Sequence, residues 1–200
     1  LKDCTDWGMT IEPVTRQEYK IKGQSKIIQK IIAAYEDAYV IAEGGCDLLG
    51  VQGAAKILEG VDQSKFDYIV SACGTGTTVS GIIHNVDSHI HVLGISVLKG
   101  ASWMQEEVNG WLGKLEEKVS KNSQATWSIN TDYHFGGYAK SSDKLNIFID
   151  QINKAHSLPL EHVYTGKALY GVLDLAGKGF FKAGSRILFI HTGGLQGARS

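Results

Sequence analysis

Short apolar segments alternate with amphipathic segments along most of this chain. Four apolar runs predict buried strands: AYVIAEGG at 38–45, FDYIVSAC at 66–73, HIHVLGISV at 89–97 and SRILFIHTGG at 185–194. Between these runs apolar residues recur at helical spacing, and the predicted helices cover 26–35, 50–60, a start at 79–86, 143–156 and 166–181. This alternation is typical of an α/β fold with a mostly parallel sheet flanked by helices.

Two further stretches carry weaker patterns. Trp103, Val108, Trp111 and Leu115 recur at helical spacing with charged residues between them, which predicts a helix with its aromatic side chains in the core. Residues 1–19 have the pattern of the end of a helix, a strand and a turn that need neighbours. We therefore expect the chain to be a fragment of a longer protein.

Composition and charge narrow the classes of function. With 200 residues and 43% hydrophobic content, the chain can bury a full core. Its 20 basic and 21 acidic residues form no long block, which argues against nucleic acid and membrane surfaces as partners. No apolar run approaches the roughly 18 to 20 residues of a membrane span, and the first residues lack a signal peptide's apolar centre, so a cytoplasmic location is expected.

The cysteines and histidines predict no metal site. Cys4, Cys46 and Cys73 lie far apart and form no CxxC pair, which favours reduced thiols over a disulfide framework or a zinc centre. The seven histidines show no metal-binding spacing.

The stretch SACGTGTTVSG at 71–81 has the pattern of a phosphate-binding loop. A strand that leads into a glycine-rich turn and then a helix places backbone N–H groups and the positive end of the helix dipole at one point. Gly74 and Gly76 allow close backbone approach, while Thr75, Thr77 and Thr78 add hydroxyl donors. No lysine follows the glycines as in nucleoside triphosphatases, and the third glycine of a dinucleotide fingerprint is missing. A single phosphate fits better than a pyrophosphate, and the bare motif leaves a plain tight turn equally open.

Five motifs in order carry a resemblance to a known family. The chain resembles pyridoxal-phosphate enzymes of fold type II, the tryptophan-synthase-β-like fold, and within them the D-cysteine desulfhydrase and 1-aminocyclopropane-1-carboxylate (ACC) deaminase family. The resemblance implies a two-domain architecture whose first part is absent, with 1–45 as the end of the smaller domain and the crossover, and 46–200 as the larger cofactor-binding domain. The motifs are AEGGCDLLGVQGA, SACGTGTTVSG, HFGGYAK, VYTGKALYG and FIHTGG.

The same resemblance assigns roles to residues that match the motifs. It implies pyridoxal 5'-phosphate as the cofactor, two catalytic tyrosines that flank cofactor and substrate, a phosphate cradle, two threonines that face the pyridine nitrogen, and a glycine turn close to the cofactor. The catalytic tyrosines are Tyr138 and Tyr164, and the phosphate cradle is Cys73, Gly74, Thr75, Gly76, Thr77 and Thr78. The threonines that face the pyridine nitrogen are Thr165 and Thr192, and the glycine turn is Gly44 and Gly45.

Other residues in these motifs receive no catalytic role. The family's Schiff-base lysine is not matched in this chain, and Lys167 is interpreted as a helix-surface or structural lysine. His191 is interpreted as a positioned structural histidine, Cys73 as a small packing residue beside the phosphate, and Cys46 is left unassigned.

The implied function is a lyase or deaminase that acts on a small D-amino acid. For D-cysteine the products would be pyruvate, ammonia and hydrosulfide, and the alternative substrate is ACC. A homodimer would suit the family, and the 200 residues alone are expected to be inactive. A nucleotide-binding α/β protein, or a catalytically silent fragment, remains open from the residues themselves.

Overall fold

The computed structural model describes residues 2–21, 24–35, 37, 39–118 and 124–195. The chain divides into two compact units, Leu1–Ile41 and Ala42–Ser200. The assignment of the first residues to the end of a smaller domain stays a prediction.

The first unit contains short helices. They are α1 (Lys2–Asp6), α2 (Arg16–Ile21) and α3 (Lys26–Ala34). The predicted helix at 26–35 is confirmed, and the Ser25 hydroxyl caps it by accepting a hydrogen bond from the Ile27 N–H at 3.3 Å.

Two strands predicted near the start of the chain are wrong. Residues 9–15 form no strand, and neither do the described residues 39–42 of the predicted strand at 38–45. Tyr39, Val40 and Ile41 are exposed rather than buried, and a strand without a neighbour to pair with gains no ladder hydrogen bonds. Residues 43–45 instead form the 3-10 turn η2 (Glu43–Gly45).

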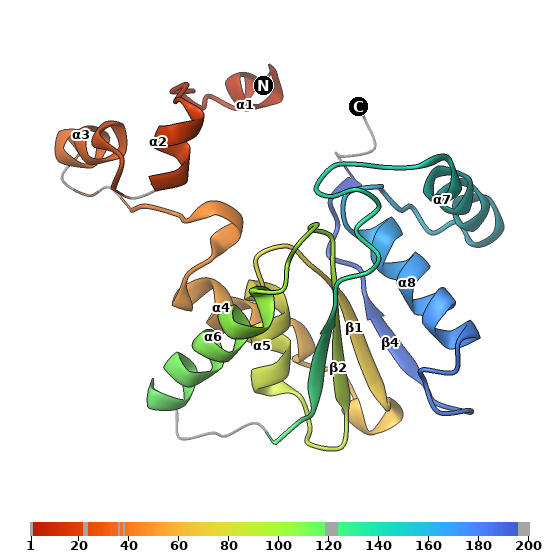
Figure 1. Cartoon of the computed structure of the whole chain (residues 1–200). Coiled ribbons are helices and arrows are strands. Elements are labelled where there is room, and N and C mark those ends of the chain that lie inside the picture. The colour runs from red at the N-terminus through yellow and green to blue at the C-terminus, as the bar shows by residue number, and fades with distance from the viewer. Residues whose placement is uncertain (1, 22–23, 36, 38, 119–123, 196–200) are drawn as a thin grey trace. The chain divides into compact units, whose positions relative to one another are not determined.

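A four-stranded parallel sheet forms the centre of the second unit (Figure 1). Its strands are β1 (Tyr68–Cys73), β2 (His91–Ser96), β3 (Trp127–Asn130) and β4 (Ile187–Ile190), in the spatial order β3-β2-β1-β4. All three pairings are parallel. The predicted parallel α/β class is confirmed, whereas β3 was not predicted.

Helices follow the strands in the order expected from the sequence. They are α4 (Leu48–Ala54), α5 (Thr77–Asn85), α6 (Met104–Lys118), α7 (Asp143–His156) and α8 (Thr165–Gly177), with the 3-10 turns η3 (Ala55–Leu58) and η4 (Gln63–Lys65). Each predicted helix of this region has a counterpart. The aromatic residues of the α6 region behave differently from each other, because Trp111 is buried but Trp103 is 45% exposed. The prediction that both lie in the core is therefore wrong for Trp103, which precedes the helix.

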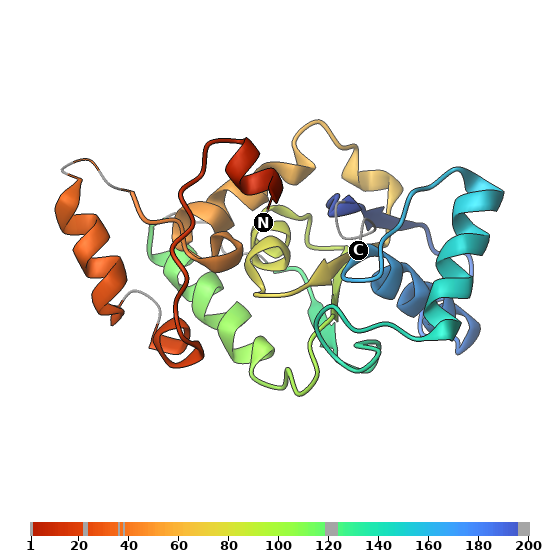
Figure 2. The same ribbon diagram turned by 90° about the horizontal axis from the view of Figure 1, so that it is seen from above.

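The sheet separates two apolar cores, because successive side chains of a strand point to opposite faces. On one face Ile69 and Val92 pack with residues of α5 and α6, such as Ile82 and Met104. On the other face Val70, Leu93 and Ile95 pack with Val172 and other residues of α8. Figures 1 and 2 show α5 and α6 on one side of the sheet and α8 on the other.

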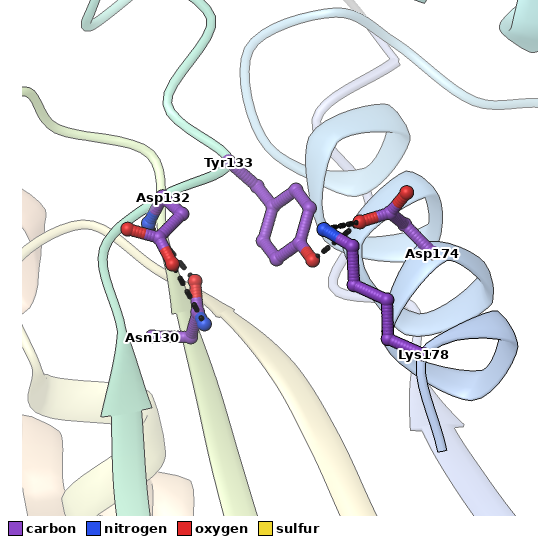
Figure 3. A network of polar contacts seen from close by, with 5 residues as sticks. All are labelled: Asn130, Asp132, Tyr133, Asp174 and Lys178. Carbon is purple, nitrogen blue, oxygen red and sulfur yellow. Dashed lines mark hydrogen bonds and ion pairs between the residues drawn. The ribbon is translucent and has the colours of Figure 1, made fainter. Parts of the chain in front are cut away.

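The segment that follows β3 is tied to α8 by a polar network (Figure 3). The Tyr133 hydroxyl donates to Asp174 Oδ2 at 2.7 Å, and Lys178 Nζ lies 2.7 Å from the same oxygen. At the end of β3 the Asp132 N–H donates to Asn130 Oδ1 at 2.9 Å, which turns the chain away from the sheet. Burial, followed by the bond to Asp174, raises the pKa of Tyr133 to about 12, so the phenol keeps its proton as the donor.

The contact between α4 and α5 generates a test of the fold. A Cβ at Gly81 would lie 2.5 Å from the Val51 carbonyl oxygen and 2.6 Å from the Ala55 nitrogen, so G81A must push two backbones apart. We expect G81A to lower the free energy of unfolding by about 1–3 kcal/mol. The matched control is G113A in α6, where no atom lies within 4 Å of the added Cβ. Helix propensity should make G113A neutral or stabilising by up to about 1 kcal/mol. Chemical denaturation measures both, and equal effects would contradict the close contact.

Candidate functional site

The candidate site lies where the strand order reverses. From β1 the chain proceeds through β2 to β3 on one side, and it returns to place β4 on the other side of β1. In doubly wound sheets ligands bind at such a reversal, beyond the carboxyl ends of the strands. The turns after β1 and β4 therefore meet at this point.

A pocket of about 280 Å³ occupies this position, close to the lower end of the usual range for ligand sites, about 300 Å³. It brings together three segments far apart in the sequence: the η2 turn, the loop after β1, and the turn after β4, with the start of α8 beside them. The residues that line it are Gly44, Ala72, Cys73, Gly74, Thr75, Gly76, Thr77, Thr78, Val79, Tyr164, Thr192, Gly193 and Gly194.

The loop after β1 presents the amino end of α5 to the pocket. Gly76 caps this helix with φ +85, a conformation that side chains rarely adopt, and provides no side-chain hydrogen bond to the helix. The first N–H groups of a helix have no acceptor within the helix, so those of Thr77, Thr78 and Val79 are donors available to an anion. The Thr75 and Thr77 hydroxyls lie 2.9 Å apart and orient each other at the same edge.

The glycines around the cradle allow neighbouring groups to pack closely against the loop. A Cβ at Gly74 would lie 3.2 Å from Tyr164 Cε1, and one at Gly44 would lie 3.1 Å from Thr75 Cγ2. Side chains at either position would therefore intrude between the loop and its neighbours. Gly45 does not line the pocket. Its carbonyl oxygen instead lies 2.0 Å from the position of a Cβ at Gly50, so it packs against α4.

The two tyrosines predicted from the sequence contact each other, and one of them lines the pocket. Tyr164 lines it, and its hydroxyl donates to Tyr138 Oη over a long 3.4 Å, with the rings edge to face at 5.9 Å. Tyr138 does not line the pocket and is 57% exposed. Burial raises the pKa of Tyr164, and the hydrogen bond to Tyr138 raises it further. Tyr164 therefore stays protonated as a hydrogen-bond donor at neutral pH.

Thr165 is not brought to the pocket. Its side chain is fully buried, and its hydroxyl donates to Glu161 Oε1 at 3.0 Å while accepting the Glu161 N–H at 3.2 Å. The Glu161 carboxylate also accepts the N–H groups of Val163, of Tyr164 at 2.8 Å and of Thr165 at 2.6 Å. This buried carboxylate caps α8 and fixes the backbone that carries Tyr164. Sequence reasoning missed Glu161, although an acid just before a helix is a known capping signal.

The turn after β4 supplies Thr192, Gly193 and Gly194. All three line the pocket, and the two glycines, quoted in a motif but given no role, have φ of +85 and +81. His191 Nδ1 accepts the Gly193 N–H at 3.2 Å, so the proton is on Nε2, which donates to the Pro159 carbonyl at 2.7 Å. These bonds support a structural role for His191, which shapes the turn.

The cysteines at the site differ in their surroundings. Cys73 contributes backbone to the pocket, while its side chain is buried in the core beneath α5. Burial raises the pKa of the Cys73 thiol to about 12, which makes it unreactive and supports its interpretation as a packing residue. Cys46 is partly exposed, and its Sγ lies 3.9 Å from both the Thr75 carbonyl oxygen and Glu107 Oε1.

Lys167 is inside the protein rather than on a helix surface, so that part of its interpretation is wrong. The residue is 0% exposed, and its Nζ donates to the Gly137 carbonyl at 2.7 Å. Burial lowers the pKa of this ammonium to about 8, although the charge of Glu161 opposes the shift. Lys167 does not line the pocket.

Two classes of site are not found in the part of the chain that the structure describes. Its Cys, His, Asp and Glu residues form no group of three or more able to hold a metal ion. None of its helices has both the length and the apolar character required to cross a membrane.

Comparison with known proteins decides which ligand chemistry this pocket belongs to. The model of the pyridoxal-phosphate dependent enzyme family matches residues 1–193. The chain belongs to this family. Pyridoxal 5'-phosphate, the cofactor that the resemblance implied, is thereby confirmed as the cofactor of the family.

Similar proteins narrow the branch of the family. A Pyrococcus horikoshii protein, provisionally assigned as an ACC deaminase, is 31% identical over 88% of this chain and 55% of its own length. A bifunctional D-cysteine desulfhydrase/ACC deaminase of Arabidopsis thaliana, a mitochondrial protein, is 30% identical over 95% of this chain and 51% of its own length. A crystal structure described as an ACC deaminase homologue superimposes with a TM-score of 0.81 at 28% identity, covering 98% of this chain and 62% of that one. The chain thus spans about half the length of the curated relatives it matches.

The pocket residues fit pyridoxal phosphate. One phosphate suits the amino end of α5, because the helix dipole and hydrogen-bond donors converge there. The hydroxyls are those of Thr75, Thr77 and Thr78. The Tyr164 ring, which packs against Gly74 and lines the pocket, offers an aromatic surface for the cofactor ring. Thr192 lines the pocket from the turn after β4.

Thr78 provides a test of the cradle. Valine has nearly the shape of threonine but no hydroxyl, so T78V removes one donor to the phosphate. We expect cofactor affinity to fall about tenfold, because a hydrogen bond to a charged group contributes about 1.5 kcal/mol or more. The melting temperature without cofactor should change little. Titration of the cofactor, followed by absorbance, measures the affinity.

The matched control is Thr126→Val. The Thr126 hydroxyl forms a 2.9 Å hydrogen bond with His91 Nδ1, and Thr126 does not line the pocket. It should leave cofactor affinity unchanged. Equal affinity of T78V and the wild type would contradict the phosphate cradle.

Proposed function

We propose that the full-length protein is a pyridoxal-phosphate-dependent lyase that converts D-cysteine, or a related β-substituted D-amino acid, to pyruvate and ammonia, with release of hydrosulfide from D-cysteine. Membership of the family supports the cofactor, and the bifunctional relative from Arabidopsis carries both activities in its name. The observation that selects between those activities is the absence of any Asp or Glu among the described residues that line the pocket.

The residues of this chain would hold the cofactor and its substrate as follows. Thr75, Thr77, Thr78 and the amino end of α5 would bind the phosphate, and the Tyr164 ring in the pocket lining would orient the aromatic group. The Tyr164 hydroxyl, with the Tyr138 hydroxyl 3.4 Å from it, would face the substrate. When bound, pyridoxal phosphate supplies an electron sink for the charge that develops at the substrate's α-carbon.

The ring nitrogen's partner sets how strong that sink is. A carboxylate would keep this nitrogen protonated, whereas a hydroxyl cannot hold a proton there. The residue after Tyr164 is Thr165, and its hydroxyl is engaged by Glu161. The Glu161 carboxylate is in turn occupied by backbone N–H groups at the start of α8. Of the two threonines predicted to face the ring nitrogen, Thr192 is the one that lines the pocket.

A weaker electron sink favours one of the two reactions. Loss of a good leaving group such as hydrosulfide from a β-carbon starts with removal of an α-proton and needs little extra stabilisation. ACC has no α-proton, so opening its ring depends more strongly on the sink. The neutral lining therefore favours D-cysteine.

ACC deamination is the second candidate, because the names of the Pyrococcus and Arabidopsis relatives include it. We expect the full-length protein to turn over D-cysteine at least tenfold faster than ACC at equal concentration. Release of ammonia and of the 2-oxo acid, with hydrosulfide measured in parallel, gives both rates, and L-cysteine is the stereochemical control. Faster turnover of ACC would overturn the argument from the neutral lining but not the cofactor assignment.

The lysine that anchors the cofactor covalently is proposed to lie outside these 200 residues. No lysine is among the described residues that line the pocket, and Lys167 donates to Gly137 instead. Borohydride reduction of the full-length protein with its cofactor, followed by peptide mapping, should place the adduct on another lysine. An adduct on Lys167 would show that the anchor is misassigned.

Two features of the whole protein also stay predictions. A homodimer suits the family, and a cytoplasmic location follows from the sequence alone. The Arabidopsis relative is mitochondrial, so location cannot be taken from the similar proteins.

A further inference from the structure

Lys167 is a buried charged group that the proposed chemistry does not use. Its side chain is 0% exposed, and its Nζ donates at 2.7 Å to the Gly137 carbonyl, which also accepts the Lys140 N–H at 3.1 Å. Taking an ammonium out of water is costly, and an apolar side chain of similar shape often stabilises a protein more. The bond to Gly137 is therefore better explained by what it positions than by stability.

The segment that Lys167 holds has an unusual backbone. Phe135, Gly136, Gly137 and Ala139 all have positive φ, at 50, 97, 126 and 53 degrees. Such conformations persist only where surrounding contacts hold them. The one residue between 135 and 139 outside this set is Tyr138, the partner of the Tyr164 hydroxyl.

A second anchor holds the same segment to the same helix. The Tyr133 hydroxyl donates to Asp174 of α8 at 2.7 Å, as Figure 3 shows. Lys167 and Asp174 are seven residues apart, about two helical turns, so both anchors lie on one face of α8. The backbone of α8 also carries Tyr164 at its N-cap. One helix thus fixes both members of the tyrosine pair.

We propose that Lys167 and Tyr133 are positioning residues that fasten the segment 133–140 to α8 and so hold the Tyr138 hydroxyl against that of Tyr164. Tyr138 is 57% exposed, and an exposed side chain on an unanchored segment would sample many orientations. The role of this pair in turnover rests on the proposed function. The anchoring itself does not.

Hydrogen exchange tests the anchoring without any turnover. Replacing Lys167 by Met keeps length and removes the donor, and Y133F removes the other one. Each variant should speed amide exchange severalfold in peptides covering 133–140. Exchange in 73–78 and cofactor affinity should stay at wild-type values. The control is Lys154→Met, the same change at an exposed lysine of α7, which should leave 133–140 unchanged. Unchanged exchange at 133–140 in Y133F and in folded K167M would overturn the proposal.

A double-mutant cycle tests the link to Tyr138. We expect K167M to lower kcat by about tenfold to a hundredfold, the scale of a misplacement of about 1 Å, with little change in KM. In the Y138F background the same substitution should cost no further activity, because its effect passes through Tyr138. Y133F provides the same comparison if K167M does not fold. Additive losses would overturn the link. If the wild type converts neither substrate, the proposed function fails while exchange still decides the anchoring.

Discussion

Parallel pairing of β1 with strands on both of its sides is the constraint on which the site depends. Register with β2 and with β4 fixes where β1 ends, and the turns after β1 and β4 emerge at the same edge of the sheet. The helix that must follow β1 then begins with its amino end at this edge. The direction of β1 in the sheet sets where the anion site lies. The threonines and glycines of the loop supply the hydrogen-bond donors and the close backbone approach at that position.

Two buried charges near the start of α8 complement this arrangement in different ways. The Glu161 carboxylate is compensated by the backbone N–H groups at the start of the helix it precedes, so it orders the N-cap. Lys167 lies on the same helix and is compensated by a carbonyl from a distant segment. One charge therefore shapes the helix itself, and the other shapes what packs against it.

Local pattern predicted those parts of the fold whose burial is regular. The strand before the phosphate loop and the helix after it are buried along most of their length, and the loop's residue types follow from what an anion requires. The short strand β3 has the sequence WSIN, whose alternation of apolar and polar residues is too short to predict a strand, and its pairing with β2 is a long-range contact. The run at 39–41 has residues with high strand propensity but no neighbouring strand to pair with, so the strand predicted there was wrong. Thr165 and Lys167 required knowledge of Glu161 and Gly137, four residues before Thr165 and thirty before Lys167, and such contacts leave no periodic signal.

Direct contacts between backbones around α4 make the phosphate end of the pocket rigid. Gly50 lies against the Gly45 carbonyl, and Gly81 of α5 lies against the Val51 carbonyl and the Ala55 nitrogen, with no side chain in between. Flexible side chains absorb small displacements by changing rotamer, but touching backbones cannot. The turn at 43–45, α4 and α5 are therefore packed together as one rigid group. A shift of the turn at 43–45 would also move α4 and α5, and with α5 the helix end that borders the pocket.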